Sequence, residues 1–318
     1  MARTRSLQTQ LVPIDTGTVR LEPDRDRPRA FMLYVNGVES SHVDLDDPAW
    51  LEFEYLRWMA TVVLEAFGPG DRLDVLHLGA AGCSLARSLL AQRPGSRHLA
   101  VEIDERLAEL VRDWFELPRA PALRIRVGEA RAVTQSLADG GRDVVVRDVF
   151  AGDRTPAPLI TVEFARHVRR VLRPGGWYLV NCADSASLDL ARDEAATLRA
   201  VFPTVLAIAD PPMLKGRRRG NVVFACTDHE VDMARLSRQL RGGPAPAGLW
   251  DDATVRNFGR HHRPLADGDP DFVTGPVEDP DWPEGIDEAA SGPRPLPEAI
   301  RARELNRLLR RSHGESDG

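Results

Sequence analysis

The chain has 318 residues, of which 42% are hydrophobic and 28% charged, a composition typical of globular proteins large enough to bury a substantial core. Its formal net charge of −6 gives no broad attraction to phosphate backbones, which argues against nucleic acid as the main partner. All apolar runs fall well short of the roughly 18 residues that a membrane-spanning helix needs, so we expect no membrane partner.

Cysteine usage and the first residues bear on the compartment. Cys83, Cys182 and Cys226 are odd in number and far apart, which argues against a disulfide framework or a zinc site. The first residues contain arginines but no apolar stretch after them, unlike a secretory signal. We therefore expect a cytoplasmic location and no metal.

The N-terminal part predicts strands followed by a helix. Residues 18–22 and 30–35 are β-prone, and Asn36-Gly37 is a strong signal for a hairpin turn, so a small antiparallel β unit is expected. Asp47-Pro48 is typical of a helix start, and the apolar positions that follow predict one buried helical face, ended by Gly68-Pro69-Gly70.

Residues 71–228 alternate between short apolar runs and helical patterns. The runs that predict strands are Leu73–Leu78, His98–Val101, Leu123–Val127, Asp143–Val146 and Trp177–Val180. The helical patterns are Ser84–Gln92, Glu105–Phe115, Arg131–Ala138, Thr161–Leu172 and Ser187–Val201. This alternation predicts an α/β fold with a parallel sheet and right-handed crossovers.

The last two predicted strands of this region break the alternation. Val205–Ala209 and Asn221–Thr227 are joined by a basic loop without a predicted helix, so we expect an antiparallel hairpin at the sheet edge. A parallel sheet that ends in such a hairpin is the layout of class I S-adenosylmethionine-dependent transferases, a Rossmann-like fold. We expect three parts: an N-terminal β-hairpin unit (1–46), a transferase core (47–228) and a C-terminal region (229–318).

The C-terminal region has weaker patterns. Val231–Arg241 predicts a helix, and Pro297–Arg311 predicts a terminal helix. Residues 242–295 between them are rich in Pro, Gly and Asp and predict irregular structure.

A turn after the first core strand is the first candidate binding element. Gly79, Ala80, Ala81 and Gly82 precede a helix, so their backbone N–H groups can approach a ligand at its N-terminus. The turn is not the dinucleotide fingerprint, because alanine and serine replace the second and third glycines. Glu102 ends the second strand, about 20 residues farther on, where a carboxylate can accept both ribose hydroxyls. Together they predict a nucleoside site; Glu102 alone could be a solvated strand-end carboxylate.

Acids also follow the third and fourth strands. Glu129 and Ala130 lie where such folds contact adenine, although a surface acid heading the next helix explains Glu129 equally well. Asp148 ends the fourth strand at the ligand crevice, where it could orient or deprotonate a nucleophile; the alternative is a cap for the next segment. Asp153 lies in the following loop beside Gly152 and either faces an acceptor or is a turn residue.

The loop Lys215–Gly220 contains four basic residues. Such a run either binds a phosphate or an acidic partner or is the solvated tip of a hairpin, and we favour the second interpretation.

Four stretches within residues 36–228 resemble the spermidine synthase (polyamine aminopropyltransferase) family. Asn36-Gly37-Val38 is similar to the family's Asp-Gly strand turn, and Glu52-Phe53-Glu54-Tyr55 to its Glu-Phe-x-Tyr helix. Val101-Glu102-Ile103-Asp104 resembles its ribose-binding segment, and Val146-Arg147-Asp148 its catalytic aspartate strand.

The resemblance implies a transferase of polyamine biosynthesis that moves an aminopropyl group from decarboxylated S-adenosylmethionine to a small-molecule amine acceptor. Glu102 and Ile103 would hold the donor beside the glycine turn. By the match, Asp148 would accept the proton that the amine must lose before it attacks, and Tyr55 would help to hold the amine. The resemblance also implies a homodimer or homotetramer, paired through the N-terminal β unit and the core.

Four positions depart from the family pattern. Gly82 stands where an aspartate usually holds the ammonium of the decarboxylated donor, Ser40 replaces a glutamine, Leu51 replaces an aspartate, and Glu129 stands where aspartate is usual. A cationic donor and a diamine together need several carboxylates. Two alternatives therefore stand beside aminopropyl transfer: a methyltransferase that uses S-adenosylmethionine on the same site, and a homologue that binds nucleosides without turnover.

Overall fold

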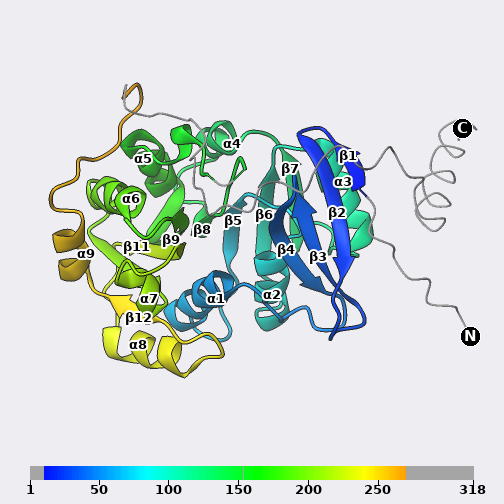
Figure 1. The fold of residues 1–318 in the computed structure, drawn as a ribbon, viewed down its shortest axis with the longest axis horizontal. Helices are drawn as coiled ribbons and strands as arrows, with labels where there is room; N and C mark the ends of the chain where they lie inside the picture. The colour runs from blue at the N-terminus through cyan, green and yellow to red at the C-terminus, as the bar shows by residue number, and fades with distance from the viewer. Residues whose placement is uncertain (1–10, 153, 270–318) are drawn as a thin grey trace, which may run out of the picture.

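The computed structural model describes residues 11–152 and 154–269, which form two β-sheets with helices packed around the larger one (Figure 1). The small sheet contains β1 (Leu11–Ile14), β2 (Gly17–Pro23), β3 (Ala30–Val35) and β4 (Val38–Asp44), paired antiparallel in that order. Asn36 and Gly37 join β3 to β4 with φ angles of 51° and 81°. Both are in the left-handed region, as a type I′ turn requires, so the predicted hairpin is confirmed.

The large sheet has the strand order β12-β10-β11-β9-β8-β5-β6-β7. Its strands are β5 (Asp74–Leu78), β6 (Arg97–Glu102), β7 (Leu123–Val127), β8 (Arg142–Arg147), β9 (Leu172–Asp184), β10 (Thr204–Ala209), β11 (Gly220–Thr227) and β12 (Gly248–Trp250). Strands β5 to β9 are parallel, as predicted, whereas β11 is antiparallel to both β9 and β10. The central strands β8, β9 and β11 contain near-continuous apolar runs, which fits a sheet covered on both faces.

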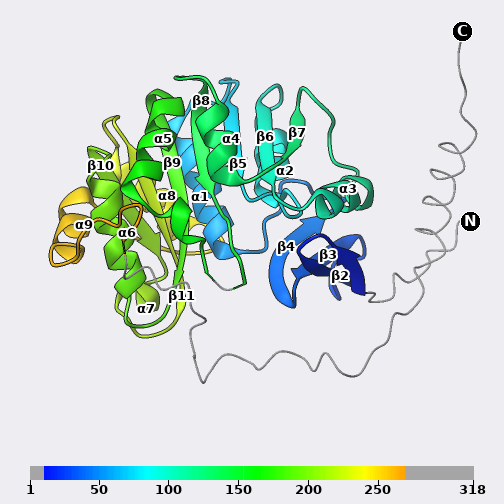
Figure 2. The ribbon, with the colours of Figure 1, turned by 90° about the horizontal axis from the view of Figure 1, so that it is seen from above.

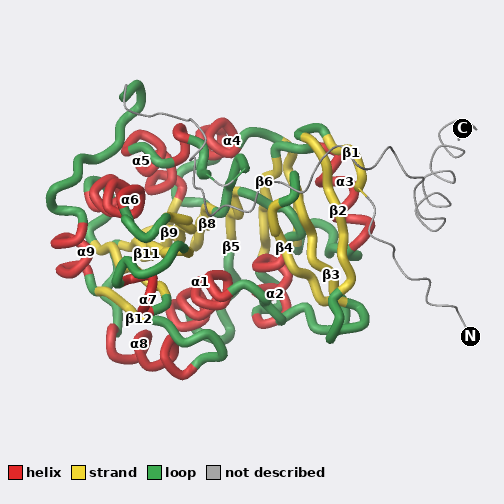
Figure 3. Tube along the Cα trace, in the orientation of Figure 1, coloured by secondary structure: helices red, strands yellow, loops and turns green. Residues whose placement is uncertain are grey.

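Helices cover both faces of this sheet. They are α1 (Glu54–Ala66), α2 (Ser84–Gln92), α3 (Glu105–Trp114), α4 (Ala130–Ser136), α5 (Val162–Val171), α6 (Asp189–Arg199), α7 (Pro211–Leu214), α8 (Met233–Gly242) and α9 (Asp252–Phe258), with a 3₁₀ turn η1 (Ala157–Leu159). Figure 3 shows α4 and α5 on one side of the strands and α1, α2 and α8 on the other. Within the described residues, no helix is long and apolar enough to cross a membrane.

The small sheet is held to the large one by its own apolar core. Leu33 of β3 and Val19 of β2 are fully buried in a cluster with Leu110 and Val111 of α3. Each such side chain contributes about 1.5–3 kcal/mol on burial. Figure 2 shows this sheet, in dark blue, at one side of the larger α/β body.

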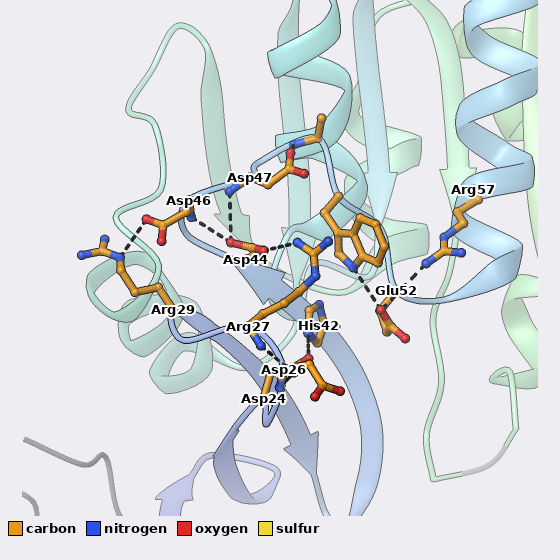
Figure 4. A network of polar contacts seen from close by, with 12 residues as sticks. Asp24, Asp26, Arg27, Arg29, His42, Asp44, Asp46, Asp47, Glu52 and Arg57 are labelled. Carbon is orange, nitrogen blue, oxygen red and sulfur yellow. Dashed lines mark hydrogen bonds and ion pairs between the residues drawn. The ribbon is translucent and has the colours of Figure 1, made fainter. Parts of the chain in front are cut away.

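The helix predicted to start at Asp47-Pro48 begins later, at Glu54. The Asp44 carboxylate accepts hydrogen bonds from the backbone N–H groups of Asp46 and Asp47, at 2.8 and 3.0 Å, and it also pairs with Arg27 (Figure 4). These contacts hold residues 44–47 in a turn that belongs to the small sheet. The prediction was wrong by about two helical turns, because the aspartate–proline signal describes this turn as well as it describes a helix N-terminus.

The hairpin of β10 and β11 is present, with two differences from the prediction. The connection contains α7, a short helix of four residues, and β10 is not at the edge because β12 pairs beside it. Strand β12 and helix α9 both lie in the segment predicted to be irregular. The predicted terminal helix at 297–311 lies outside the described residues.

Candidate active site

A cavity of about 1240 Å³ lies between the small sheet and the C-terminal ends of β5, β6 and β8. Most of the predicted site residues line it: Tyr55, Gly79, Ala80, Ala81, Glu102, Ile103, Glu129, Ala130 and Asp148. Gly82 is not among its lining residues, and Asp153 lies outside the described residues. Among the residues described, no group of three or more His, Cys, Asp or Glu side chains is arranged to hold a metal ion.

Gly79 brings the turn after β5 against the end of β8. Its φ of 86° is in the left-handed region, and a Cβ atom there would lie 2.1 Å from the backbone oxygen of Asp148. Only glycine combines this conformation with this approach. The turn and the strand end that carries Asp148 are therefore adjacent parts of one site.

The Glu102 carboxylate faces this turn. Its Oε2 accepts hydrogen bonds from the N–H groups of Ala80 and Ala81, at 3.3 and 3.0 Å, and its Oε1 accepts from Ile103 and Asp104. A carboxylate has about four lone-pair positions, so these four N–H donors occupy all of them, and ribose hydroxyls would bind here by replacing some of the backbone donors. Ile103, 61% exposed, presents an apolar surface beside it. A carboxylate next to an apolar surface suits a nucleoside, with the ribose on the first and the base on the second.

Asp104 attaches the small sheet to this part of the cavity wall. Its carboxylate caps α3 through the N–H of Leu107 and accepts from the N–H and hydroxyl of Thr16, at 2.7 and 2.9 Å. Burial alone would raise the pKa of Asp104, but these hydrogen bonds outweigh it and the pKa lies below its usual value. The β1–β2 turn is thereby fixed beside Glu102.

Glu129 is a helix cap. Its two carboxylate oxygens accept from the N–H groups of Arg131 and Ala132, both at 2.7 Å, at the start of α4. The side chain lines the cavity, yet both of its oxygens are engaged by the backbone. Of the two interpretations that the sequence left open, the geometry shows the capping role.

Gly82 packs against the small sheet. Its N–H donates to Ser41 Oγ of β4 at 2.9 Å, and a Cβ atom on it would lie 2.8 Å from Ser41 Cβ and 3.0 Å from Val43 Cγ2. The space that a longer side chain would need is filled by β4. Gly82, where the resemblance led us to expect an aspartate, is therefore in close contact with Ser41, which lies 41 residues earlier in the sequence.

Asp148 lies at the centre of a polar cluster inside the cavity. Its Oδ2 accepts the hydroxyl of Tyr55 at 3.1 Å, and its Oδ1 accepts the side-chain amide of Asn181 at 2.8 Å. Burial raises the pKa of Asp148, and the hydrogen bonds from Asn181 and Tyr55 offset this only in part. Burial and the nearby carboxylate raise the pKa of Tyr55 well above its usual value, so the phenol stays protonated and donates. The arrangement provides a carboxylate with increased affinity for a proton.

Asn181 and Asn221 are site residues that the sequence reasoning missed. Asn221, at the start of β11, donates its amide to Asn181 Oδ1 at 2.9 Å, which orients the Asn181 amide toward Asp148. Asn181 directly follows the predicted strand Trp177–Val180. It shares with Asp148 the signal of a polar residue at the end of an apolar run, and that signal could have found it.

A buried ion pair supports the strand ends from behind. Arg147, next to Asp148, pairs with Glu194 of α6 at 2.7 Å, and both side chains are 1% exposed. The same guanidinium donates to the backbone oxygens of Asn181 and Leu159, at 3.2 and 3.0 Å. The positions of β9 and of η1 at the cavity therefore depend on this pair.

Comparisons with known proteins agree with this geometry. A scan against models of protein families finds no match, and no curated protein matches. Among solved structures, a probable spermidine synthase from Corynebacterium glutamicum is 40% identical, with a TM-score of 0.77 over 83% of this chain and 98% of its own. The fold is shared with a spermidine synthase from Thermotoga maritima, at 12% identity and a TM-score of 0.54 over 78% of this chain and 83% of its own. It is also shared with a spermidine synthase in complex with the transition-state analogue AdoDATO. That protein is 12% identical, with a TM-score of 0.56 over 78% of this chain and 84% of its own.

The mostly parallel sheet with a reversed β11, and the glycine turn after β5, define a class I S-adenosylmethionine-dependent transferase fold, as predicted. Given the 40% identity over most of both chains, the chain belongs to the spermidine synthase family. The resemblance found in the sequence is confirmed, and the membership supports a transferase.

Proposed function

We propose that this protein transfers an aminopropyl group from decarboxylated S-adenosylmethionine to a primary amine. The observation that carries the proposal is the cluster of Asp148, Tyr55 and Asn181 in the cavity, in a member of the spermidine synthase family. A half-buried carboxylate with a raised pKa, held by two neutral donors, is suited to accept a proton from an ammonium group.

The donor end of the cavity fits a nucleoside. Glu102 would accept the ribose hydroxyls, Ile103 would cover one face of the base, and the N–H groups of the turn at Gly79 would lie along the ligand. The donor, when bound, supplies a sulfonium centre that makes the adjoining carbon electrophilic. The protein's part is to align that carbon with the amine, and alignment of two reactants can supply several kcal/mol of the barrier, roughly 7–11 in the best cases.

At the acceptor end, Asp148 takes a proton from the ammonium form of the amine. The freed lone pair forms a bond to the carbon next to sulfur, the carbon–sulfur bond breaks, and its electrons go to sulfur. The products are an aminopropylated amine and neutral methylthioadenosine, with one proton left on Asp148 for release to water. Tyr55 and Asn181 hold the carboxylate in place throughout.

Methyl transfer from S-adenosylmethionine is the second candidate, and the Gly82 contact favours it. Where the family usually has an aspartate for the donor's ammonium, this chain has a glycine packed on Ser41. A donor that keeps its carboxylate could be held by backbone N–H groups of the turn and would not need that aspartate.

The two candidates are separated by calorimetric binding of each donor to the full chain, followed by product analysis with mixed amines. Tighter binding of the decarboxylated donor and release of methylthioadenosine would support aminopropyl transfer. Preference for intact S-adenosylmethionine with release of S-adenosylhomocysteine would reject it. Binding without either product would indicate a nucleoside-binding homologue.

Asp148→Asn tests the catalytic assignment. The variant should lose at least about 100-fold in turnover, the usual contribution of a positioned base, while donor affinity is retained. Asp139→Asn is a matched control, because the Asp139 side chain is 77% exposed and does not line the cavity. Unchanged turnover in Asp148→Asn would remove Asp148 from the mechanism.

A further inference from the structure

The acceptor end of the cavity extends from Asp148 to the basic loop before β11. Hydrogen bonds lead from Asp148 to Asn181 and on to Asn221, the second residue of β11. Arg218 and Arg219 lie just before this strand and line the same cavity. The loop that the sequence favoured as a solvated hairpin tip therefore contributes two cations to the site.

Arg218 connects this loop with the two acids nearest to it. Its guanidinium lies 2.9 Å from Asp210 Oδ2 and 4.0 Å from Glu54 Oε2, and all three side chains line the cavity. Glu54 precedes Tyr55 at the start of α1, so the cluster is adjacent to the Asp148 cluster through the chain itself. The Arg218 side chain is 52% exposed, and its guanidinium has five N–H donors, so donors remain for a further partner.

The charges at the two ends of the acceptor site differ. Asp148 is held by neutral donors, a phenol and an amide, and can receive an ammonium group. Arg218 is paired with Asp210 Oδ2 and lies 4.0 Å from Glu54 Oε2, and Arg219 of the same loop also lines the cavity. A second ammonium group at this end would lie beside Arg218 and Arg219 and be repelled by them; the oxygen open to it is Asp210 Oδ1, which is buried and has no hydrogen-bond partner among the described residues. An anion there would instead find a guanidinium whose donors suit a carboxylate.

We propose that the acceptor is a primary amine whose far end carries an anionic group such as a carboxylate. The amine lies at Asp148, and the anion is bound by Arg218, with Arg219 beside it on the cavity wall. This inference rests on the proposed transfer to an amine and specifies the chemical class of that amine.

Three amines with the same four-carbon spacer and different far ends test it: 4-aminobutanoate, butylamine and butane-1,4-diamine. Their binding to the full chain saturated with methylthioadenosine is measured by calorimetry. We expect 4-aminobutanoate to bind at least about 10-fold more tightly than butylamine, because a charge-assisted hydrogen bond contributes about this factor, and butane-1,4-diamine to bind most weakly.

Arg218→Gln should abolish the preference for 4-aminobutanoate and strengthen binding of butane-1,4-diamine, because it frees Asp210 and Glu54. Arg235→Gln is the matched control, since Arg235 is 58% exposed, pairs with Glu65 on the surface and does not line the cavity. Tightest binding of butane-1,4-diamine to the unmodified protein, equal binding of all three amines, or no binding of 4-aminobutanoate would each overturn the proposal.

Binding requires no turnover, so this result is independent of the proposed reaction. Product analysis with decarboxylated S-adenosylmethionine and the same three amines is run alongside. Preference for 4-aminobutanoate without any aminopropylated product would reject the reaction and leave the charge preference of the site in place. Aminopropylation of butane-1,4-diamine in preference to 4-aminobutanoate would support the reaction and reject the acceptor class.

Discussion

Replacing Gly82 by aspartate is the sharpest test of the structural reason for the missing donor carboxylate. The new Cβ would lie 2.8 Å from Ser41 Cβ and 3.0 Å from Val43 Cγ2, distances that require β4 to shift. Ser41 and Val43 are 4% and 1% exposed, so neither side chain has solvent to move into. Backbone strain plays no part, because Gly82 is not among the residues with positive φ.

The expected cost follows from these contacts. Overpacking a filled site costs about 1–3 kcal/mol, and losing the Gly82–Ser41 hydrogen bond adds about 0.5–1.5 kcal/mol, so Gly82→Asp should destabilise by about 2–4 kcal/mol. That is a large part of a total stability of about 5–15 kcal/mol. Ser41→Gly removes the obstructing side chain, so the double variant should be more stable than the sum of the two single effects, by about 1 kcal/mol or more.

Urea unfolding of the single and double variants measures this coupling. Gly70→Asp is a matched control, because a Cβ on Gly70 meets nothing within 4 Å and the change should stay within about 0.5 kcal/mol. If Gly82→Asp unfolds at the same urea concentration as the unmodified chain, the packing argument is refuted. In the double variant, the new carboxylate should also improve binding of decarboxylated S-adenosylmethionine over the intact donor, by about 10-fold.

Three further predictions concern other parts of the site. Tyr55→Phe removes a hydrogen bond that lowers the pKa of Asp148, so this pKa should rise further. Because the base acts deprotonated, the acid side of the pH–rate profile should then move to higher pH. An unmoved profile would contradict the assignment. Glu194→Gln leaves Arg147 charged and buried, which should cost about 3–5 kcal/mol and lower the Tm by about 6–20 °C in a thermal melt, whereas a change of only a few degrees would mean that the pair is dispensable. Glu102→Gln should weaken calorimetric binding of methylthioadenosine about 10-fold, and unchanged affinity would show that the ribose is bound elsewhere.

The features that could be predicted from the sequence depend on residues that are close in the chain. Asn36-Gly37 fixes the β3–β4 turn through two left-handed residues, and the apolar runs fix the parallel strands. Glu102 and Asp148 could be singled out because the C-terminal ends of parallel strands meet at one edge of the sheet. For the same reason their convergence on one cavity needed no knowledge of distant contacts.

The features that could not be predicted depend on contacts between distant segments. The start of α1 is delayed because residues 44–47 are held by Asp44 and Arg27 of the small sheet. The close packing at Gly82 depends on Ser41 of β4, and no local sequence pattern predicts that Ser41 lies beside the turn. Asp153, a predicted acceptor contact, lies outside the described residues and stays a prediction.

The partners of the acids in the cavity divide its chemistry. Glu102 accepts four backbone N–H groups and has no cation among its hydrogen-bond partners in the described part of the chain, so hydroxyl donors would compete with backbone donors for its oxygens. Asp210 is paired with Arg218 through Oδ2. Asp148 accepts hydrogen bonds from two neutral donors, Tyr55 and Asn181, and its pKa is raised, so this carboxylate is suited to take up a proton. The proposed reactants follow this division, with a ribose at Glu102, an amine at Asp148 and an anion at Arg218 beside Asp210.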